Sequence, residues 1–322
     1  LAEKREERGI HYTPSIITTA MSKSLVNEIF MQLKNELLDT IKDCQFEKAR
    51  EIVKKLINIK ILDPACGSGS FLVKLLRLLW DLYQEIRNET EWAIKKENLY
   101  EPEDITERKQ QIITIRQMLG LDSKRKTVAL IILRHLYGID LDEKAIAVAK
   151  VNIWKEAIKL SPSDYRHTEL SSGIDHILPN LEMNLIHANS LIDFPASVCI
   201  KALAGHKDAI KRLHEIRDEY LRNPYNPSVL NECMEIKRKI MTKIHKLFKK
   251  KYGDISDLPL FAPLNFFFCY FNEDGDPIDI SEQGFPGIIG NPPYDVFVED
   301  KYFKQSIAAG TSNLFSHFIV KG

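Results

Sequence analysis

Near the carboxyl end of the chain, Asn291, Pro292, Pro293 and Tyr294 combine an amide, a rigid backbone and an aromatic ring. They follow residues 287–290, a short apolar run bounded by glycines that is typical of a buried parallel strand. Prolines cannot donate to a sheet ladder, so the strand ends at Asn291. Open α/β sheets bind ligands at the carboxyl ends of their strands, so we expect this group at a ligand-binding edge.

These residue types suit the activation of an amino group attached to an aromatic base. Such a nitrogen is a poor nucleophile because its lone pair is delocalised into the ring. Two acceptors aimed at its N–H bonds draw it toward tetrahedral geometry, and the Asn291 side-chain oxygen and the Pro292 carbonyl can be those acceptors. The prolines fix φ and so pre-aim the carbonyl, while Tyr294 can stack on the base. An ordinary strand-ending turn is the alternative interpretation.

A glycine-containing turn forms a second candidate site. Residues 59–63 predict the first strand, and an apolar helix is expected from Phe71 to about Arg87. A strand, turn and helix in this order place backbone N–H groups and a helix N-terminus beside a nucleotide-like ligand. The turn has neither the dinucleotide fingerprint nor the P-loop ending, and a tight turn without a ligand is the alternative. The turn comprises Asp63, Pro64, Ala65, Cys66, Gly67, Ser68 and Gly69.

Two further predicted strands end in polar residues. Residues 136–140 end at Asp140, and residues 184–188 are followed by Asn189. In nucleotide-binding folds an acidic residue after the second strand holds ribose hydroxyls. Asn189 is placed to hydrogen-bond an adenine ring at the same edge. A helix cap at Asp140 and a simple strand-to-loop turn at Asn189 are the alternatives.

The elements around these residues predict a doubly wound α/β sheet with four segments. Residues 1–58 predict an N-terminal helical segment, and residues 59–196 the first part of the sheet. Residues 88–135 predict two inserted helices, at about 103–118 and 124–135. Their mixed charges indicate a solvated face. Residues 197–283 predict a basic helical hairpin followed by a buried aromatic connector. Residues 284–322 hold the strand and loop with Asn291 and the start of another helix, and we expect a C-terminally truncated fragment.

Composition limits the partners. The chain has 322 residues, 44% of them hydrophobic and 28% charged, which is typical of a globular protein. The net charge is zero, so DNA or RNA contact must depend on local patches. Residues 201–251 contain 14 Lys and Arg against 6 Asp and Glu, and they are the best candidate for phosphate contact, with a solvated insertion as the alternative. Five scattered cysteines predict a reducing, cytoplasmic location without a disulfide framework or zinc site, and no apolar run has membrane-spanning length.

The order of the motifs resembles the N6-adenine DNA methyltransferases of restriction-modification systems. It is closest to type II enzymes that fuse methylase and nuclease in one chain, followed by type I modification subunits. The resemblance covers nearly the whole chain, although the two insertions match loosely. It departs from the family at Asn189, where many relatives have Asp, and at Pro286. The matching motifs are Tyr12-Thr13-Pro14, residues 63–69, Gly138-Ile139-Asp140, Asn189-Ser190-Leu191 and residues 291–294.

The resemblance implies a Rossmann-like fold that uses S-adenosylmethionine as methyl donor and double-stranded DNA with a flipped adenine as substrate. Asn291, Pro292, Pro293 and Tyr294 would be the catalytic residues. A nuclease or specificity domain or subunit would lie outside this chain. The residues implied for donor binding are Tyr12, Thr13, Pro14, Asp63, Pro64, Ala65, Cys66, Gly67, Gly69, Phe71, Asp140, Leu141, Asn189, Ser190 and Leu191.

Two other functions compete with this interpretation. The tetrapeptide at residues 291–294 also serves enzymes that methylate glutamine side chains in release factors and guanine amino groups in ribosomal RNA. The Tyr12-Thr13-Pro14 segment upstream of the glycine turn argues against them. A non-catalytic DNA-binding subunit on a methyltransferase scaffold is the other alternative, and the intact tetrapeptide argues against it.

Overall fold

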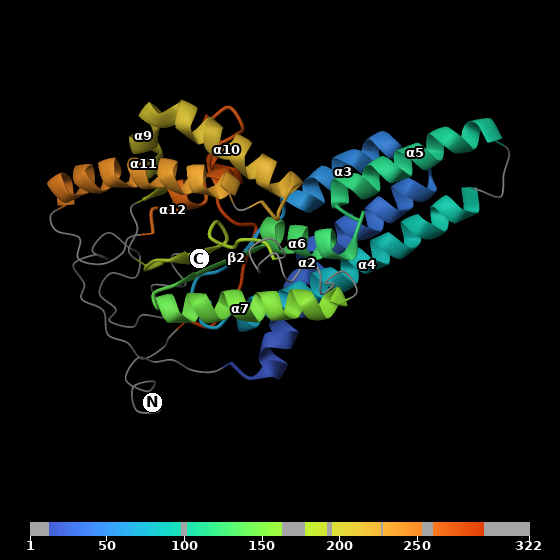
Figure 1. Cartoon of the computed structure of the whole chain (residues 1–322), viewed down its shortest axis with the longest axis horizontal. Helices are drawn as coiled ribbons and strands as arrows, with labels where there is room; N and C mark the ends of the chain where they lie inside the picture. The colour runs from blue at the N-terminus through green and yellow to red at the C-terminus, as the bar shows by residue number, and fades with distance from the viewer. Residues whose placement is uncertain are drawn as a thin grey trace.

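A parallel sheet forms the centre of the computed structural model, which describes residues 13–97, 102–162, 178–191, 195–226, 228–252 and 260–292 (Figure 1). Its strands lie in the order β3-β2-β1-β4 and pair in parallel throughout. The strands are β1 (Ile61–Asp63), β2 (Leu136–Asp140), β3 (Leu185–His187) and β4 (Gly287–Ile288). The chain winds from β1 outward to β3 and then returns to the other side of β1. The winding direction therefore reverses between β1 and β4, where such sheets bind ligands.

Helices cover both faces of the sheet, which confirms the predicted doubly wound α/β fold. In Figure 1, α7 (Glu143–Leu160) lies on one side of the strands, together with the start of α4 (Ser70–Glu97). The helices that follow β3 lie on the other side. These are α9 (Ala196–Leu203), α10 (Lys207–Arg222), α11 (Ser228–Tyr252) and α12 (Ala262–Asn265).

The described residues before the first strand are helical. They form α2 (Ser15–Lys42) and α3 (Phe46–Asn58), which extend away from the sheet beside α4 and α5 (Pro102–Leu119). Helix α3 shows why the segment folds in this way. Its buried residues Ala49, Ile52, Val53 and Leu56 recur at helical spacing and form one apolar face.

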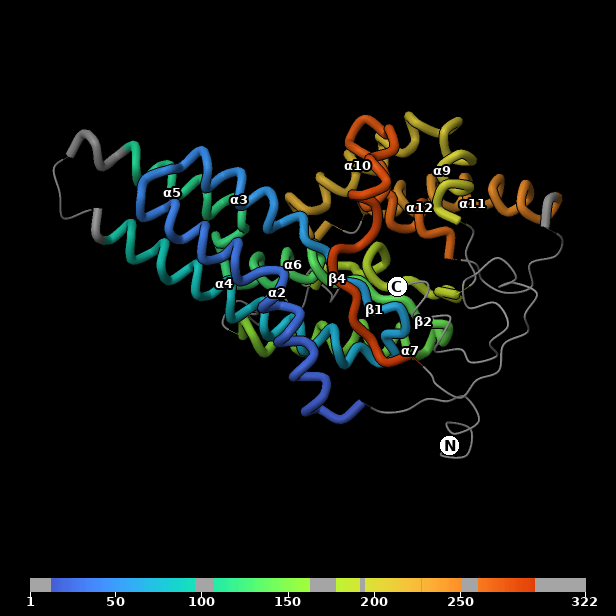
Figure 2. Tube along the Cα trace, turned by 180° about the vertical axis from the view of Figure 1, so that it is seen from behind, coloured from blue at the N-terminus to red at the C-terminus, as the bar shows by residue number. Residues whose placement is uncertain are grey.

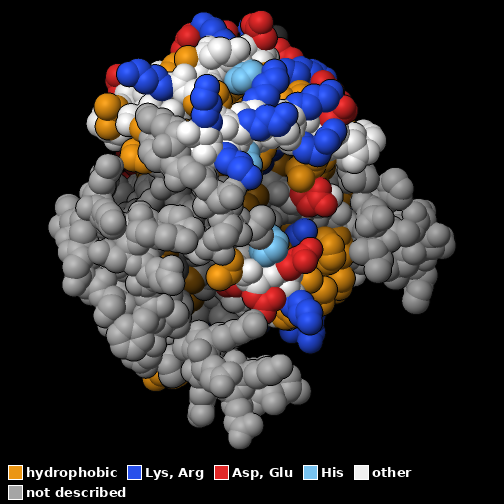
Figure 3. Space-filling view, turned by 90° about the vertical axis from the view of Figure 1, so that its left-hand side faces the viewer, with side chains coloured by type: hydrophobic (Ala, Val, Ile, Leu, Met, Phe, Trp, Pro, Cys, Tyr) orange, Lys and Arg blue, Asp and Glu red, His pale blue; other side chains and the backbone are white. Residues whose placement is uncertain are grey.

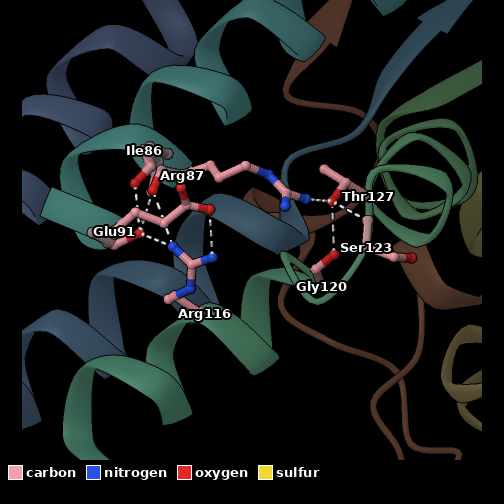
Figure 4. A network of polar contacts seen from close by, with 8 residues as sticks. Ile86, Arg87, Glu91, Arg116, Gly120, Ser123 and Thr127 are labelled. Atoms are coloured by element: carbon pink, nitrogen blue, oxygen red, sulfur yellow. Dashed lines mark hydrogen bonds and ion pairs between the residues drawn. The ribbon is translucent and has the colours of Figure 1, made fainter. Parts of the chain in front are cut away.

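The inserted helices fall where the sequence predicts them, but their description as a solvated face was wrong for α6 (Lys124–His135). Every residue from Thr127 to Leu133 is buried, and the two lysines and two arginines of this helix gather at its two ends. Polar contacts join α4 to both α5 and α6 (Figure 4). The Arg87 guanidinium donates to the Thr127 hydroxyl at 2.8 Å, and Arg116 donates to the Arg87 carbonyl at 3.0 Å and the Glu91 carboxylate at 3.1 Å.

The basic insertion contains the predicted hairpin, with its break between α10 and α11, and in addition the short helix α9. The aromatic connector that follows is core, as predicted. Phe266, Phe267 and Phe268 are buried, and the rings of Phe266 and Phe268 lie 6.0 and 5.2 Å from that of Tyr137 on β2. The connector thus packs directly on the sheet.

Strand β4 is shorter than predicted. Only Gly287 and Ile288 form the strand, and Ile288 is 39% exposed rather than buried, because β4 has a neighbour on one side only among the described strands. Figure 2 shows β4 lying beside β1. The Ile289 amide still donates to the Leu62 carbonyl at 2.9 Å, so the chain stays attached to β1 until it reaches Asn291. Among the described helices, none is both long and apolar enough to cross a membrane.

Candidate active site at the carboxyl edge of the sheet

Asn291 is held at the winding reversal by a residue from the other end of the chain. Its side-chain NH₂ group donates to the Thr13 hydroxyl at 2.9 Å. Thr13 directly precedes Pro14 and the first turn of α2, and Asn291 follows the β4 segment. Two segments that the sequence singles out separately, 278 positions apart, therefore meet through one hydrogen bond.

The glycine turn is attached to the end of β2. The Gly67 amide donates to the Asp140 carboxylate at 2.7 Å, and the Cys66 amide donates to the Ile139 carbonyl at 2.9 Å. The second oxygen of Asp140 accepts from the Asp142 amide at 2.9 Å. Asp140 therefore orients the turn as well as the loop that begins α7.

The backbone of the turn leaves room for a ligand at Gly67. This residue has φ +52°, and a Cβ added to it would meet no heavy atom within 4 Å. Gly69, with φ +81°, is instead packed against α7, where an added Cβ would lie 3.2 Å from that of Ala149. Open backbone at one glycine and close helix packing at another fit the binding of a nucleotide-like group beside the start of α4.

Asp63 lies between the turn and Asn291. Its side chain is almost completely buried, and one oxygen accepts from the Ala65 amide at 3.2 Å. Burial raises the pKa of Asp63 to about 8, the nearby charge of Asp140 adds to the rise, and the bond from Ala65 opposes it. A Cβ added to Gly290 would come within 2.9 Å of the Asp63 oxygen, so the close approach of the Asn291 segment requires glycine there.

The third strand end joins the same edge. The Ala188 amide donates to the Asp140 carbonyl at 3.0 Å, and the Asn189 side-chain oxygen accepts from the Leu191 amide at 3.0 Å. Leu141 is 59% exposed beside them. The structure therefore brings the predicted residues of β1, β2 and β3 to one edge.

Not every predicted donor-binding residue faces that edge. Cys66 and Phe71 are buried in the core at 5% and 4% exposure, so their side chains support the turn from beneath. Tyr12, Pro293 and Tyr294 lie outside the described residues, and their roles stay predictions.

A cavity next to this edge was not predicted. It has a volume of about 270 Å³ and lies between α2, α4 and α7, with Thr13, Ser68, Lys74 and Lys155 among its lining residues. Among the described residues that line it, Glu156 alone is acidic, and Arg77 neutralises it through two hydrogen bonds of 2.6 and 2.7 Å. The cavity is thus basic and rich in hydroxyls. In the sequence, the only trace of this cavity is the helical spacing of basic residues within 74–77 and 155–159. The two groups come together only when the three helices pack.

Comparison with known protein families agrees with this geometry. Residues 38–309 match the family described as MmeI, DNA-methyltransferase domain. A putative type II restriction enzyme and methyltransferase of Methanocaldococcus jannaschii is 29% identical over 213 residues, which are 60% of this chain and 15% of that protein. DNA methyltransferase A of Bacillus subtilis is 26% identical over 155 residues, 47% of this chain and 14% of that protein.

The chain thus spans only a small part of the length of these relatives. The family match, in contrast, covers most of the chain, including the glycine turn, the ends of β2 and β3 and the Asn291 segment. It confirms the resemblance to DNA methyltransferases that the order of the motifs indicates. The chain belongs to the MmeI DNA-methyltransferase domain family.

Proposed function

We propose that this protein methylates the N6 amino group of adenine in double-stranded DNA, with S-adenosylmethionine as the donor. The observation that carries the proposal is the hydrogen bond between Asn291 and Thr13 at the winding reversal of the sheet. It puts the amide that acts on the target next to the segment expected to cover the donor. The glycine turn and Asp140 lie at the same edge.

The direction of this hydrogen bond matters for the chemistry. Because the NH₂ group of Asn291 donates to Thr13, the side-chain oxygen is the atom that has to accept from the amino group of the target base. The Pro292 carbonyl supplies the second acceptor in this scheme. A flipped amide would present N–H donors to an amino group and would repel it. The hydrogen bond to Thr13 therefore anchors the Asn291 side chain through its NH₂ group.

The residues that would hold the donor fit a nucleotide-like group, as the open backbone at Gly67 indicates. Thr13 and Pro14 would bind its methionine part together with the glycine turn, Asp140 its ribose, and Asn189 its adenine ring. When bound, S-adenosylmethionine supplies a methyl group on a positively charged sulfur, which is the electrophile for an amine. Asp63 would lose its proton beside such a positive charge, because a nearby cation lowers a carboxyl pKa.

We also propose that the protein is the modification part of a restriction-modification system in the cytoplasm. The archaeal relative is named as both a restriction enzyme and a methyltransferase, which supports this context. A nuclease or a specificity domain or subunit outside this chain would then supply cleavage and target recognition.

The test uses the full-length protein, radiolabelled S-adenosylmethionine and DNA of mixed sequence. Wild-type protein is expected to label N6-methyladenine, and Asn291→Ala to abolish the label. Asn35→Ala on the exposed surface of α2 is the matched control and should keep full activity. Label in RNA or in protein would refute adenine in DNA as the target. Donor binding without any transfer would indicate a non-catalytic scaffold.

A further inference from the structure

Helix α11 carries a row of lysines along one face of its carboxyl-terminal half. Lys239, Lys243, Lys246 and Lys250 follow one another at intervals of four, three and four residues, and all four are exposed. Side chains at these intervals project from the same side of a helix. We call this row the lysine stripe.

Among the described residues, the ion pairs of nearby acids reach only the first lysine of the stripe. Glu215 and Glu232 pair with Arg212 at 3.1 and 2.8 Å, and Glu235 pairs with Lys239 at 2.7 Å. From residue 236 to residue 250 the sequence contains no Asp or Glu. Within the described part of the chain, the structure accordingly shows no ion pair for Lys243, Lys246 or Lys250.

The field of the stripe reaches a neighbouring side chain. Burial lowers the pKa of His206, at the start of α10, and the charge of Lys243 lowers it further. Repulsion of a second positive charge is the behaviour of a surface whose own cations are not compensated by acids.

The stripe lies on the same side of the molecule as the candidate active site. In Figure 1 the carboxyl edge of the sheet faces left, because α7 begins there directly after β2. The carboxyl-terminal end of α11 points to the same side. Figure 3 views the molecule from this side, and Lys and Arg side chains gather in its upper part, over the basic insertion.

The dimensions of the stripe suit a nucleic-acid backbone. Lys239 and Lys250 are eleven positions apart, which is about 16 Å along a helix. A DNA duplex has a phosphate about every 3.4 Å per strand, so this length corresponds to roughly five phosphates. Lysines that merely complement the helix dipole are needed only in the last turn. The stripe runs over three turns, so capping explains only its end.

We propose that the lysine stripe binds the phosphate backbone of DNA beside the base that is presented to Asn291. This inference rests on the proposed function and adds where the duplex lies. Contacts to phosphates carry no sequence information but fix the position and orientation of a protein on the duplex. The stripe then holds the DNA across the carboxyl edge whatever the recognition sequence is.

The experiment compares the full-length wild type with K243Q/K246Q/K250Q. Duplex affinity is measured by fluorescence anisotropy over a series of KCl concentrations. Each lost phosphate contact lowers the slope of log affinity against log salt by about 0.9, so the triple variant should lose about 2 to 3 from the slope. The matched control is K48Q/K54Q/K55Q, which removes three exposed charges from α3, on the far side of the molecule. Its slope should equal that of the wild type.

The outcomes separate the inference from the proposed function. An unchanged slope in the stripe variant, or an equal loss in both triple variants, would overturn the inference. A wild type that does not bind duplex DNA would overturn both ideas. A stripe-specific loss of slope together with methyl transfer that is insensitive to Asn291→Ala would support the stripe and reject the proposed chemistry. Equal thermal unfolding and donor affinity in all variants exclude misfolding as the cause.

Discussion

Replacing Thr13 by Val tests whether one hydroxyl positions the amide of Asn291, the proposed catalytic group. Valine keeps the shape of threonine but cannot accept the hydrogen bond from the Asn291 NH₂ group, which measures 2.9 Å in the structure. The amide oxygen and nitrogen of asparagine have nearly the same shape. With valine that anchor is lost, and packing alone holds the amide in its productive position and orientation.

The expected magnitude follows from the strength of that bond. A neutral hydrogen bond contributes about 0.5–1.5 kcal/mol net, which corresponds to roughly a 2- to 13-fold change in the population of the oriented amide. We expect Thr13→Val to lower kcat by about this factor. Duplex affinity should stay unchanged, because binding of the DNA depends mainly on phosphate contacts.

The assay is single-turnover methyl transfer with saturating donor and DNA, which separates chemistry from binding. Thr13→Ser is the matched control, since serine keeps the hydroxyl, and it should recover most of the rate. Equal rates for Thr13→Val and wild type would refute the orienting role. A lower rate that Thr13→Ser shares would assign the effect to packing of the methyl group instead.

Three further predictions concern the surroundings of the site. Asp63→Asn should flatten the pH dependence of stability. The pKa of Asp63 is raised to about 8 in the folded protein, so the stability that the protonated carboxyl contributes is fully present below its unfolded pKa of about 4. That stability is lost as the pH rises from about 4 to 8, by up to about 1.4 kcal/mol per pH unit. Urea unfolding between pH 5 and 9 checks this, and parallel curves for variant and wild type would contradict it. Gly290→Ala places a Cβ 2.9 Å from the Asp63 oxygen, and it should lower the free energy of unfolding by about 1–3 kcal/mol and weaken donor binding. Gly205→Ala is the control, because an added Cβ has open space there, and calorimetry should show unchanged stability. Arg77→Met leaves the Glu156 side chain, at 7% exposure, without its bidentate partner. The fold should lose about 1–3 kcal/mol, a value reduced by the exposure of Arg77 and by the nearby Lys159. A denaturation midpoint equal to that of Arg77→Lys would rule this out.

Local patterns were enough to find the elements and the residues at their ends. The predicted strand of residues 136–140 appears with the same bounds as β2, and the helices predicted at about 103–118 and 124–135 correspond to α5 and α6. Strand periodicity, glycine turns and proline stops act over a few neighbouring residues, so they can be recognised without knowing the fold. Asp63, Asp140, Asn189 and Asn291 were therefore identified as residues that follow strands.

The same local patterns failed where burial is decided by distant contacts. The mixture of basic and acidic residues across residues 88–135 suggested a solvated face, yet Thr127 to Leu133 on α6 are buried by the surrounding helices. Likewise, β4 resembles a buried strand in sequence but is an edge strand among those described. Its exposure depends on which strand lies next to it, and strand order is not a local property.

By itself, the sequence determined which residues end the strands and which chemistry they can perform, because those features depend on residue type and short-range spacing. Tertiary structure decided that β4 pairs with β1, and so that Asn291 comes close to Asp63 and Thr13. It also decided that Asp63 holds its proton near neutral pH, since desolvation arises only after the surrounding elements pack. The orientation of the Asn291 amide belongs to the same category, because its partner lies 278 positions away.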